Sequence, residues 1–193
     1  KALWDVPISS DSTASGLQLL SGMRRDPKGM EFSNLLPPEN PDAPPKDAYL
    51  EVLRIAKELV ERDPEKKWMA RYLDPRTFSA ARKLAKPILM TALYGSSLQT
   101  NTNAVKDEFF KAGLFPGELN YQDVLEVSKQ LRTASKHVFP MAFRALDWIT
   151  KLFNQAKKNG NTSFTWTTPN LDSIHLIAEY YETKRIDSKF LGK

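Results

Sequence analysis

One apolar stripe at helical spacing, in residues 46–63, constrains the fold more than any other feature of the sequence. Its apolar side chains recur every three or four residues: Tyr49, Val52, Leu53, Ala56, Leu59 and Val60. In an α-helix these residues lie on one face, which has to be buried against other elements. The stripe therefore predicts a helix that forms one wall of a helical core.

Three further segments have apolar residues at helical spacing: 15–26, 77–94 and 121–156. Gly95 suits the end of the second segment, and Pro140 is expected to break or kink the third. Five prolines within residues 33–45 predict an extended surface loop. Residues 97–117 are polar and mixed.

Strand patterns lie toward the two ends of the chain: 3–8, 162–168 and 174–181. The last two flank a turn at residues 169–172, which predicts a β-hairpin. The predicted fold class is therefore α+β and mostly helical. Because the strand at 3–8 and the final segment, 184–193, have no local pairing partners, we expect the chain to be a piece of a larger domain.

The composition is that of a globular domain, with 41% hydrophobic and 26% charged residues in 193. No run of about 20 apolar residues predicts a membrane helix, and no leader pattern opens the sequence. The absence of cysteine excludes disulfides and thiolate metal sites. A net charge of +5 moderately favours polyanionic partners.

The first candidate site is the segment 11–18, DSTASGLQ. Asp11 follows a predicted strand and precedes a predicted helix. A carboxylate held at a strand end can bind Mg²⁺ against a triphosphate, because Mg²⁺ prefers one or two carboxylates together with phosphate oxygens. The alternative is that Asp11 caps the following helix.

The second candidate site is the segment 82–95, RKLAKPILMTALYG. Arg82 and Lys86 are one helical turn apart and face the same way. Tyr94 lies two turns further on, rotated by about 80° from Lys86. Two cations and an aromatic ring on one face suit a nucleoside triphosphate. The alternative is an amphipathic helix with solvated cations.

The two sites in this order resemble motifs A and B of the single-subunit, bacteriophage-type DNA-directed RNA polymerases and their mitochondrial and plastid relatives. Three other stretches fit this resemblance: 34–37 (NLLP), 142–149 (AFRALDWI) and 166–169 (WTTP). The resemblance implies a partial palm and fingers of a right-hand polymerase. It assigns 1–45 to the palm strand and motif A, 46–120 to the fingers, and 121–193 to palm-flanking helices and a hairpin.

The resemblance also implies roles for motif A. Asp11 would hold both catalytic Mg²⁺ ions, and the Ser12 carbonyl would contact metal where family members usually have glycine. In DNA polymerases of the Pol I type, a glutamate five residues after the aspartate blocks the ribose 2′-hydroxyl. Gly16 occupies this position here, which favours ribonucleotides.

In motif B, the resemblance assigns Lys86 to the incoming triphosphate and to leaving-group chemistry, with Arg82 beside it on phosphate oxygens. Tyr94 would close over the nucleotide and help to select ribose, and Gly95 would let the backbone pass closely. Pro87 departs from a regular helix because proline disfavours helical backbone in the preceding residue. The helix is therefore expected either to kink at Pro87 or to begin anew there.

A second catalytic aspartate, carried by a His-Asp motif in the family, is missing from this sequence. His137 and His175 are not followed by aspartate, and we interpret both as structural or surface residues. Asp172 with Ser173 resembles the motif superficially, but 166–169 matches an earlier hairpin of the family. We therefore expect this chain alone to be inactive.

The activity implied is template-directed RNA synthesis, with DNA template, nascent RNA and ribonucleoside triphosphates as partners and two Mg²⁺ ions as cofactors. A monomeric complete enzyme is expected, without membrane association, in the cytoplasm of an infected cell or in an organelle. The alternatives are a non-enzymatic basic nucleic-acid-binding module, a Pol I-type DNA polymerase fragment, and a decayed product without activity.

Overall fold

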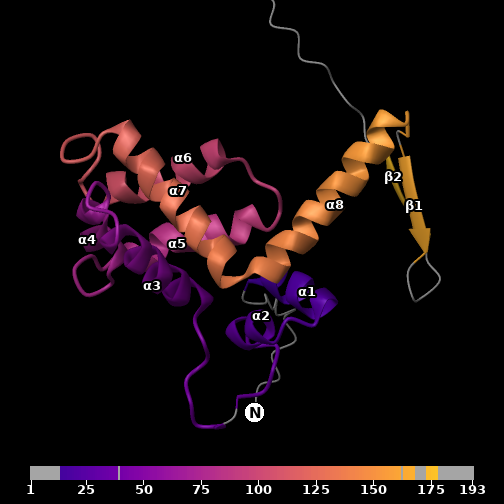
Figure 1. Ribbon diagram of the computed structural model, residues 1–193, viewed down its shortest axis with the longest axis horizontal. Helices are drawn as coiled ribbons and strands as arrows, with labels where there is room; N and C mark the ends of the chain where they lie inside the picture. Colours follow the sequence, from indigo (N-terminus) through magenta and orange to yellow (C-terminus); the bar gives the residue numbers. More distant parts are fainter. Residues whose placement is uncertain (1–13, 39, 162, 168–172, 178–193) are drawn as a thin grey trace, which may run out of the picture. The chain divides into compact units, whose positions relative to one another are not determined.

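A computed structural model describes residues 14–38, 40–161, 163–167 and 173–177, and these are mostly helical (Figure 1). The chain divides into two compact units, residues 1–148 and 149–193. The elements follow in the order α1 (Ser15–Arg24), α2 (Pro27–Phe32), α3 (Ala48–Glu61), the 3-10 turn η1 (Lys67–Met69), α4 (Ala70–Leu73), α5 (Ala81–Ala92), α6 (Leu98–Lys111), α7 (Tyr121–Val138), α8 (Pro140–Lys158), β1 (Ser163–Thr167) and β2 (Ser173–Ile177).

The predicted helix at 46–63 is confirmed as α3, and its stripe forms part of the core. Five of the six stripe residues are buried: Tyr49, Val52, Leu53, Ala56 and Val60. Asp47 begins the helix, because its Oδ1 accepts hydrogen bonds from the backbone N–H groups of Tyr49 and Leu50, at 2.9 and 3.1 Å. This face packs on α5 and α7, as Figure 1 illustrates.

The helix predicted at 77–94 is confirmed as α5, which is shorter and spans Ala81–Ala92. Asp74 explains the late start: its carbonyl accepts hydrogen bonds from the N–H groups of Thr77 and Phe78, which closes a turn before the helix. Arg76 and Lys57 also bond the Asp74 carboxylate, and these contacts hold its pKa well below the ordinary value. The side chain thus joins this turn to α3.

Pro87 lies inside α5, so the helix does not begin anew there. The buried positions of α5 continue on both sides of the proline, with Leu84, Ile88 and Leu89 fully buried. Because proline has no N–H, the carbonyl one turn earlier loses its helical partner. Burial of this apolar face stabilises the helix in spite of that loss.

α6 was not predicted from the sequence, because its buried face is partly polar. Ser97 begins it by accepting a hydrogen bond from the Thr100 N–H at 3.1 Å. Its buried positions then include Asn101 and Thr102 before Val105 and Phe109. The two polar residues interrupt the apolar pattern that identifies a helix.

The break predicted at Pro140 is confirmed, with α7 ending at Val138 and α8 beginning at Pro140. Proline suits the first helical position, where its missing N–H needs no partner. Phe139 between the helices is fully buried and packs edge-on against Phe32, with ring centroids 6.2 Å apart. Burial of Phe139 and its contact with Phe32 therefore hold the junction between α7 and α8 in place.

In the second unit, the predicted hairpin is confirmed as the antiparallel pair β1–β2, in which Thr165 lies opposite His175. The predicted strand at 3–8, the predicted turn at 169–172 and residues 178–181 of the last strand lie outside the described residues. In the described part of the chain, no helix has the length and apolar character needed to cross a membrane.

Gly29 supports the close packing of α2, which was not predicted, against α1. A Cβ atom at Gly29 would overlap Ser21 Oγ and lie 2.8 Å from Ser21 Cβ. We expect Gly29→Ala to destabilise the chain by about 1–3 kcal/mol, as overpacking does. Urea unfolding followed by circular dichroism measures this loss.

Gly22→Ala is the matched control, because a Cβ there would only reach ordinary contact with Leu35, at 3.5 Å. We expect it to be neutral or stabilising by up to about 1 kcal/mol. Ser21→Ala should partly rescue Gly29→Ala, since Ser21 Oγ is buried and has no hydrogen-bond partner among the described residues. Equal effects of the two glycine variants would contradict this explanation.

Candidate functional site

Tyr94 lies just beyond the C-terminus of α5, in a turn closed by Gly95. The N–H groups of Tyr94 and Gly95 donate to the carbonyls of Thr91 and Ala92, at 3.0 and 3.1 Å. Gly95 has φ of 80°, a conformation that favours glycine. A Cβ at Gly95 would meet no described atom within 4 Å, so its backbone conformation, rather than close packing, accounts for glycine in this structure.

The structure brings Tyr94 against the start of α1, although the two are about 80 residues apart in sequence. The hydroxyl groups of Tyr94 and Ser15 are hydrogen-bonded at 2.6 Å. A Cβ on Gly16 would lie 3.2 Å from Tyr94 Cζ, tighter than ordinary contact. Gly16 therefore lets the tyrosine ring lie directly on the helix backbone, while Tyr94 as a whole residue remains 64% exposed.

The first turn of α1 follows a strained residue. Ala14 occupies the N-cap position with φ of 53° and ψ of 50°, and it makes no side-chain capping bond. A left-handed backbone at a non-glycine residue costs on the order of 1 kcal/mol and is often found at functional sites. Asp11 and Ser12, and with them the alternative in which the Asp11 side chain caps this helix, lie outside the described residues.

Arg82 is paired with the residue that begins α3. Its Nε donates to Asp47 Oδ2 at 2.6 Å, and the guanidinium lies 4.8 Å from the centre of the Tyr49 ring. Burial raises the pKa of the Tyr49 hydroxyl above its ordinary value, although the nearby Arg82 lowers it. Both partners of the ion pair are partly exposed, at 46% and 25%, so the pair is weak and exchangeable.

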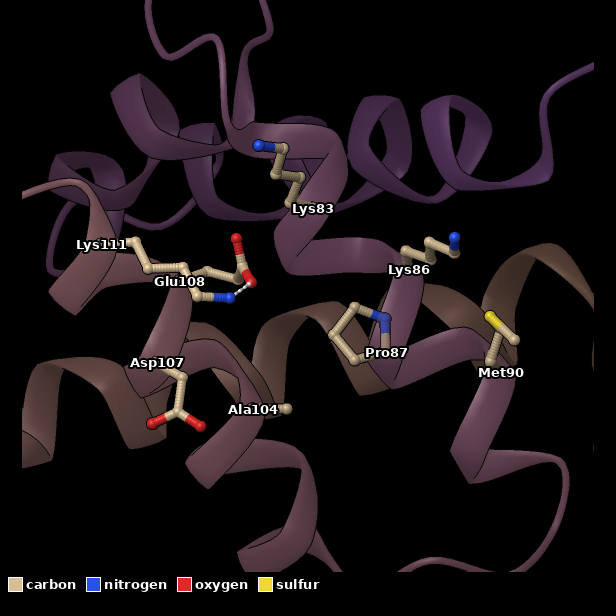
Figure 2. Close-up of a pocket in the computed structure, with 8 residues that line it drawn as sticks. All are labelled: Lys83, Lys86, Pro87, Met90, Ala104, Asp107, Glu108 and Lys111. Carbon is tan, nitrogen blue, oxygen red and sulfur yellow. Dashed lines mark hydrogen bonds and ion pairs between the residues drawn. The ribbon is translucent and has the colours of Figure 1, made fainter.

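Lys86 lines a shallow cavity of about 380 Å³ between α5 and α6 (Figure 2). Figure 2 shows Lys83 and Lys86 extending from α5 in different directions. Across the cavity, Lys111 is paired with Glu108 at 2.6 Å. No ion pair among the described residues involves Lys83 or Lys86, so both ammonium groups are available to a ligand.

The geometry brings together Gly16 and Tyr94, which were predicted from separate motifs, and it adds Ser15 and Asp47, which were not predicted. Ser15 is one of several hydroxyl residues in its segment, and nothing in the sequence distinguishes it as a partner of Tyr94. Asp47 is recognisable from sequence as a helix cap. Its ion pair with Arg82 can be identified only from the three-dimensional structure.

Both candidate segments lie within a match to a known protein family. The family model for DNA-dependent RNA polymerase matches residues 3–189. The chain belongs to the single-subunit, phage-type DNA-directed RNA polymerase family. This match covers most of the chain and includes both candidate segments, so the resemblance noted from the motifs is confirmed.

Among the polymerases of this family, the mitochondrial DNA-directed RNA polymerase 1 of Arabidopsis thaliana is 28% identical over 87% of this chain. The DNA-directed RNA polymerase of Pseudomonas phage phiKMV is 29% identical over 93% of it. The probable DNA-directed RNA polymerase of Neurospora crassa is 26% identical over 95%. The chain covers 17%, 22% and 22% of these relatives, about a fifth of their length.

Asp47 has two roles, which two substitutions can separate. Asp47→Ala removes both the cap and the ion pair with Arg82, and we expect a loss of about 1–2 kcal/mol of stability. Asp47→Asn keeps a capping oxygen and loses only the ion pair, with an expected cost below about 1 kcal/mol. Urea unfolding of both variants checks this, and equal losses would mean that the ion pair dominates.

Proposed function

We propose that this segment serves template-directed RNA synthesis and contributes motifs A and B to the nucleotide site of a polymerase. The substrates are ribonucleoside triphosphates, and the partners are a DNA template and the nascent RNA. The observation that carries the proposal is the contact of Ser15 and Gly16 with Tyr94, because it joins the two motifs at one place. Membership of the family supports the reaction class.

In this proposal the chain forms parts of the palm and fingers. Residues 1–45 supply the palm strand and motif A, 46–120 form the fingers around α5, and 121–193 supply palm-flanking helices and the hairpin. α3 and α6 each pack on both α5 and α7, and α5 packs on α7, which supports a single helical body for the fingers segment and α7. We propose that the complete enzyme acts as a monomer, in a phage-infected cell or in an organelle.

Asp11 and Ser12 are the proposed ligands for metal. A carboxylate and a carbonyl oxygen are ligands that Mg²⁺ prefers, so their chemistry fits the ion. Two Mg²⁺ ions, when bound, would stabilise the attacking and leaving oxygens of nucleotidyl transfer. Within the described ranges, no group of three or more His, Cys, Asp or Glu side chains could hold a metal ion.

The basic side chains of α5 bind the triphosphate in this proposal. Lys86 has no ion-pair partner among the described residues and neutralises charge on the phosphates as a point charge. Arg82 exchanges its weak pair with Asp47 for phosphate oxygens, which it can bind in bidentate fashion. Tyr94, anchored by Ser15, covers the sugar, and Gly16, which has no side chain, lets the tyrosine ring lie against the start of α1.

Nucleotide binding by the 193-residue chain tests the proposal. A fluorescent ribonucleoside triphosphate should bind in Mg²⁺ and lose affinity in EDTA and in Asp11→Asn. A non-enzymatic nucleic-acid-binding module would instead bind duplex DNA equally well without metal or nucleotide, because its contacts are with backbone phosphates. That second pattern would contradict the proposal. With only one catalytic carboxylate assigned, we expect no RNA synthesis by this chain alone.

A further inference from the structure

A polar network surrounds the end of α5. Asn101 of α6 donates through Nδ2 to Thr91 Oγ1 at 2.7 Å and to Ser96 Oγ at 3.0 Å. Its Oδ1 accepts a hydrogen bond from Arg132 of α7 at 2.7 Å. The same Arg132 nitrogen donates to the Ser96 carbonyl at 2.9 Å. The network therefore joins three helices through one turn.

Because these polar groups are buried, the network is stable only if each group keeps its hydrogen-bond partners. The Asn101 side chain is fully buried, and its oxygen and nitrogen are both hydrogen-bonded. Arg132 is half-buried, and the ion pairs of the described residues include no carboxylate partner for it. Its positive charge is thus directed at two neutral oxygens. Buried polar groups that lose a partner are costly, so the arrangement tolerates little displacement.

The turn held by this network is the one that carries Tyr94. Both Tyr94 and Ser96 donate their backbone N–H groups to the Thr91 carbonyl, at 3.0 and 3.1 Å. The Tyr94 side chain itself is mostly exposed, so core packing does not fix its ring. The ring position therefore depends on the Ser15 hydroxyl at one end and on the turn backbone at the other.

We propose that Asn101 and Arg132 are positioning residues for Tyr94, and that through it they set the preference of the nucleotide site for ribose over deoxyribose. This inference rests on the proposed function. Neither side chain needs to touch the nucleotide. They hold the turn so that the tyrosine ring lies over Gly16, where the sugar of a bound nucleotide would be discriminated.

The first measurement uses the 193-residue chain and needs no polymerase activity. Chain labelled with 3-fluorotyrosine gives a ¹⁹F NMR line for Tyr94, assigned by its loss in Tyr94→Phe. We expect this line to shift in Asn101→Leu and in Arg132→Met. Val105→Ala, which shortens a fully buried side chain one turn further along α6, should leave it in place. An unshifted Tyr94 line in both network variants would overturn the inference.

The second measurement compares kcat/KM for ribonucleotides and deoxyribonucleotides in the complete polymerase. We expect the ratio to fall about tenfold in Asn101→Leu and Arg132→Met, to recover in Arg132→Lys, and to stay within about twofold in Val105→Ala. Arg132 is only half-buried on α7, so we expect its variants to fold. They therefore test the inference even if Asn101→Leu does not fold. A recovered ratio in Arg132→Lys distinguishes positioning from general destabilisation.

The outcomes separate this inference from the proposed function. If Tyr94→Phe lowers the ratio while both network variants keep it, the positioning inference is wrong and the proposed function stands. If Tyr94→Phe leaves the ratio unchanged, the assignment of Tyr94 to sugar selection is wrong, and the inference fails with it.

Discussion

Gly16→Glu in the complete polymerase is expected to lower kcat/KM for ribonucleotides by at least about a hundredfold, equivalent to about 2.7 kcal/mol of transition-state stabilisation. Even the first side-chain atom would lie 3.2 Å from Tyr94 Cζ and 3.4 Å from Leu93 Cβ. The remaining atoms would displace the ring and bring a carboxylate beside a triphosphate and the ribose 2′-hydroxyl. Steady-state extension with each nucleotide type measures the effect.

Gly16→Ala and Gly16→Gln are the matched controls. Alanine requires Tyr94 to move by only a few tenths of an ångström, so we expect a loss below about tenfold. Glutamine has the size of glutamate without its charge and separates steric from electrostatic effects. Ribonucleotide use that is unaffected in Gly16→Glu would show that Gly16 is not at the sugar, and the RNA-polymerase assignment of this position would be wrong.

The sequence predicts those helices that bury a single face made of apolar side chains. The stripe of α3 and the break at Pro140 needed only helical periodicity and proline chemistry. α6 was missed because Asn101 and Thr102 occupy core positions, and the partners that satisfy Asn101 come from α5 and α7. A buried polar residue is understandable only once its partners are placed.

The candidate site likewise has residues that the sequence identifies and contacts that only the structure shows. Gly16 and Tyr94 were identified from motif spacing, but spacing does not indicate which residues of one motif contact the other. The Ser15–Tyr94 hydrogen bond and the Asp47–Arg82 pair join residues 79 and 35 positions apart. Such contacts are set by the packing of α1 and α3 against α5, which is a property of the whole helical unit.

Lys86→Ala in the complete polymerase is expected to lower kcat by about a hundredfold or more, the usual consequence of removing one charge-stabilising donor from a reaction site. Its ammonium group has no ion pair among the described residues, and Lys86 is exposed. Figure 2 shows its side chain extending from α5. The helix should remain folded, because alanine is the best helix former and Lys86 buries little surface.

Lys83→Ala is the control for Lys86→Ala, since Lys83 has the same charge, lies on the same helix and borders the same cavity. Because it extends in another direction, we expect its loss to stay within about threefold. A general electrostatic attraction between α5 and nucleic acid would instead weaken both variants similarly and make both losses depend on salt. Single-turnover extension at two ionic strengths decides between a lysine placed at the triphosphate and a helix that is merely basic.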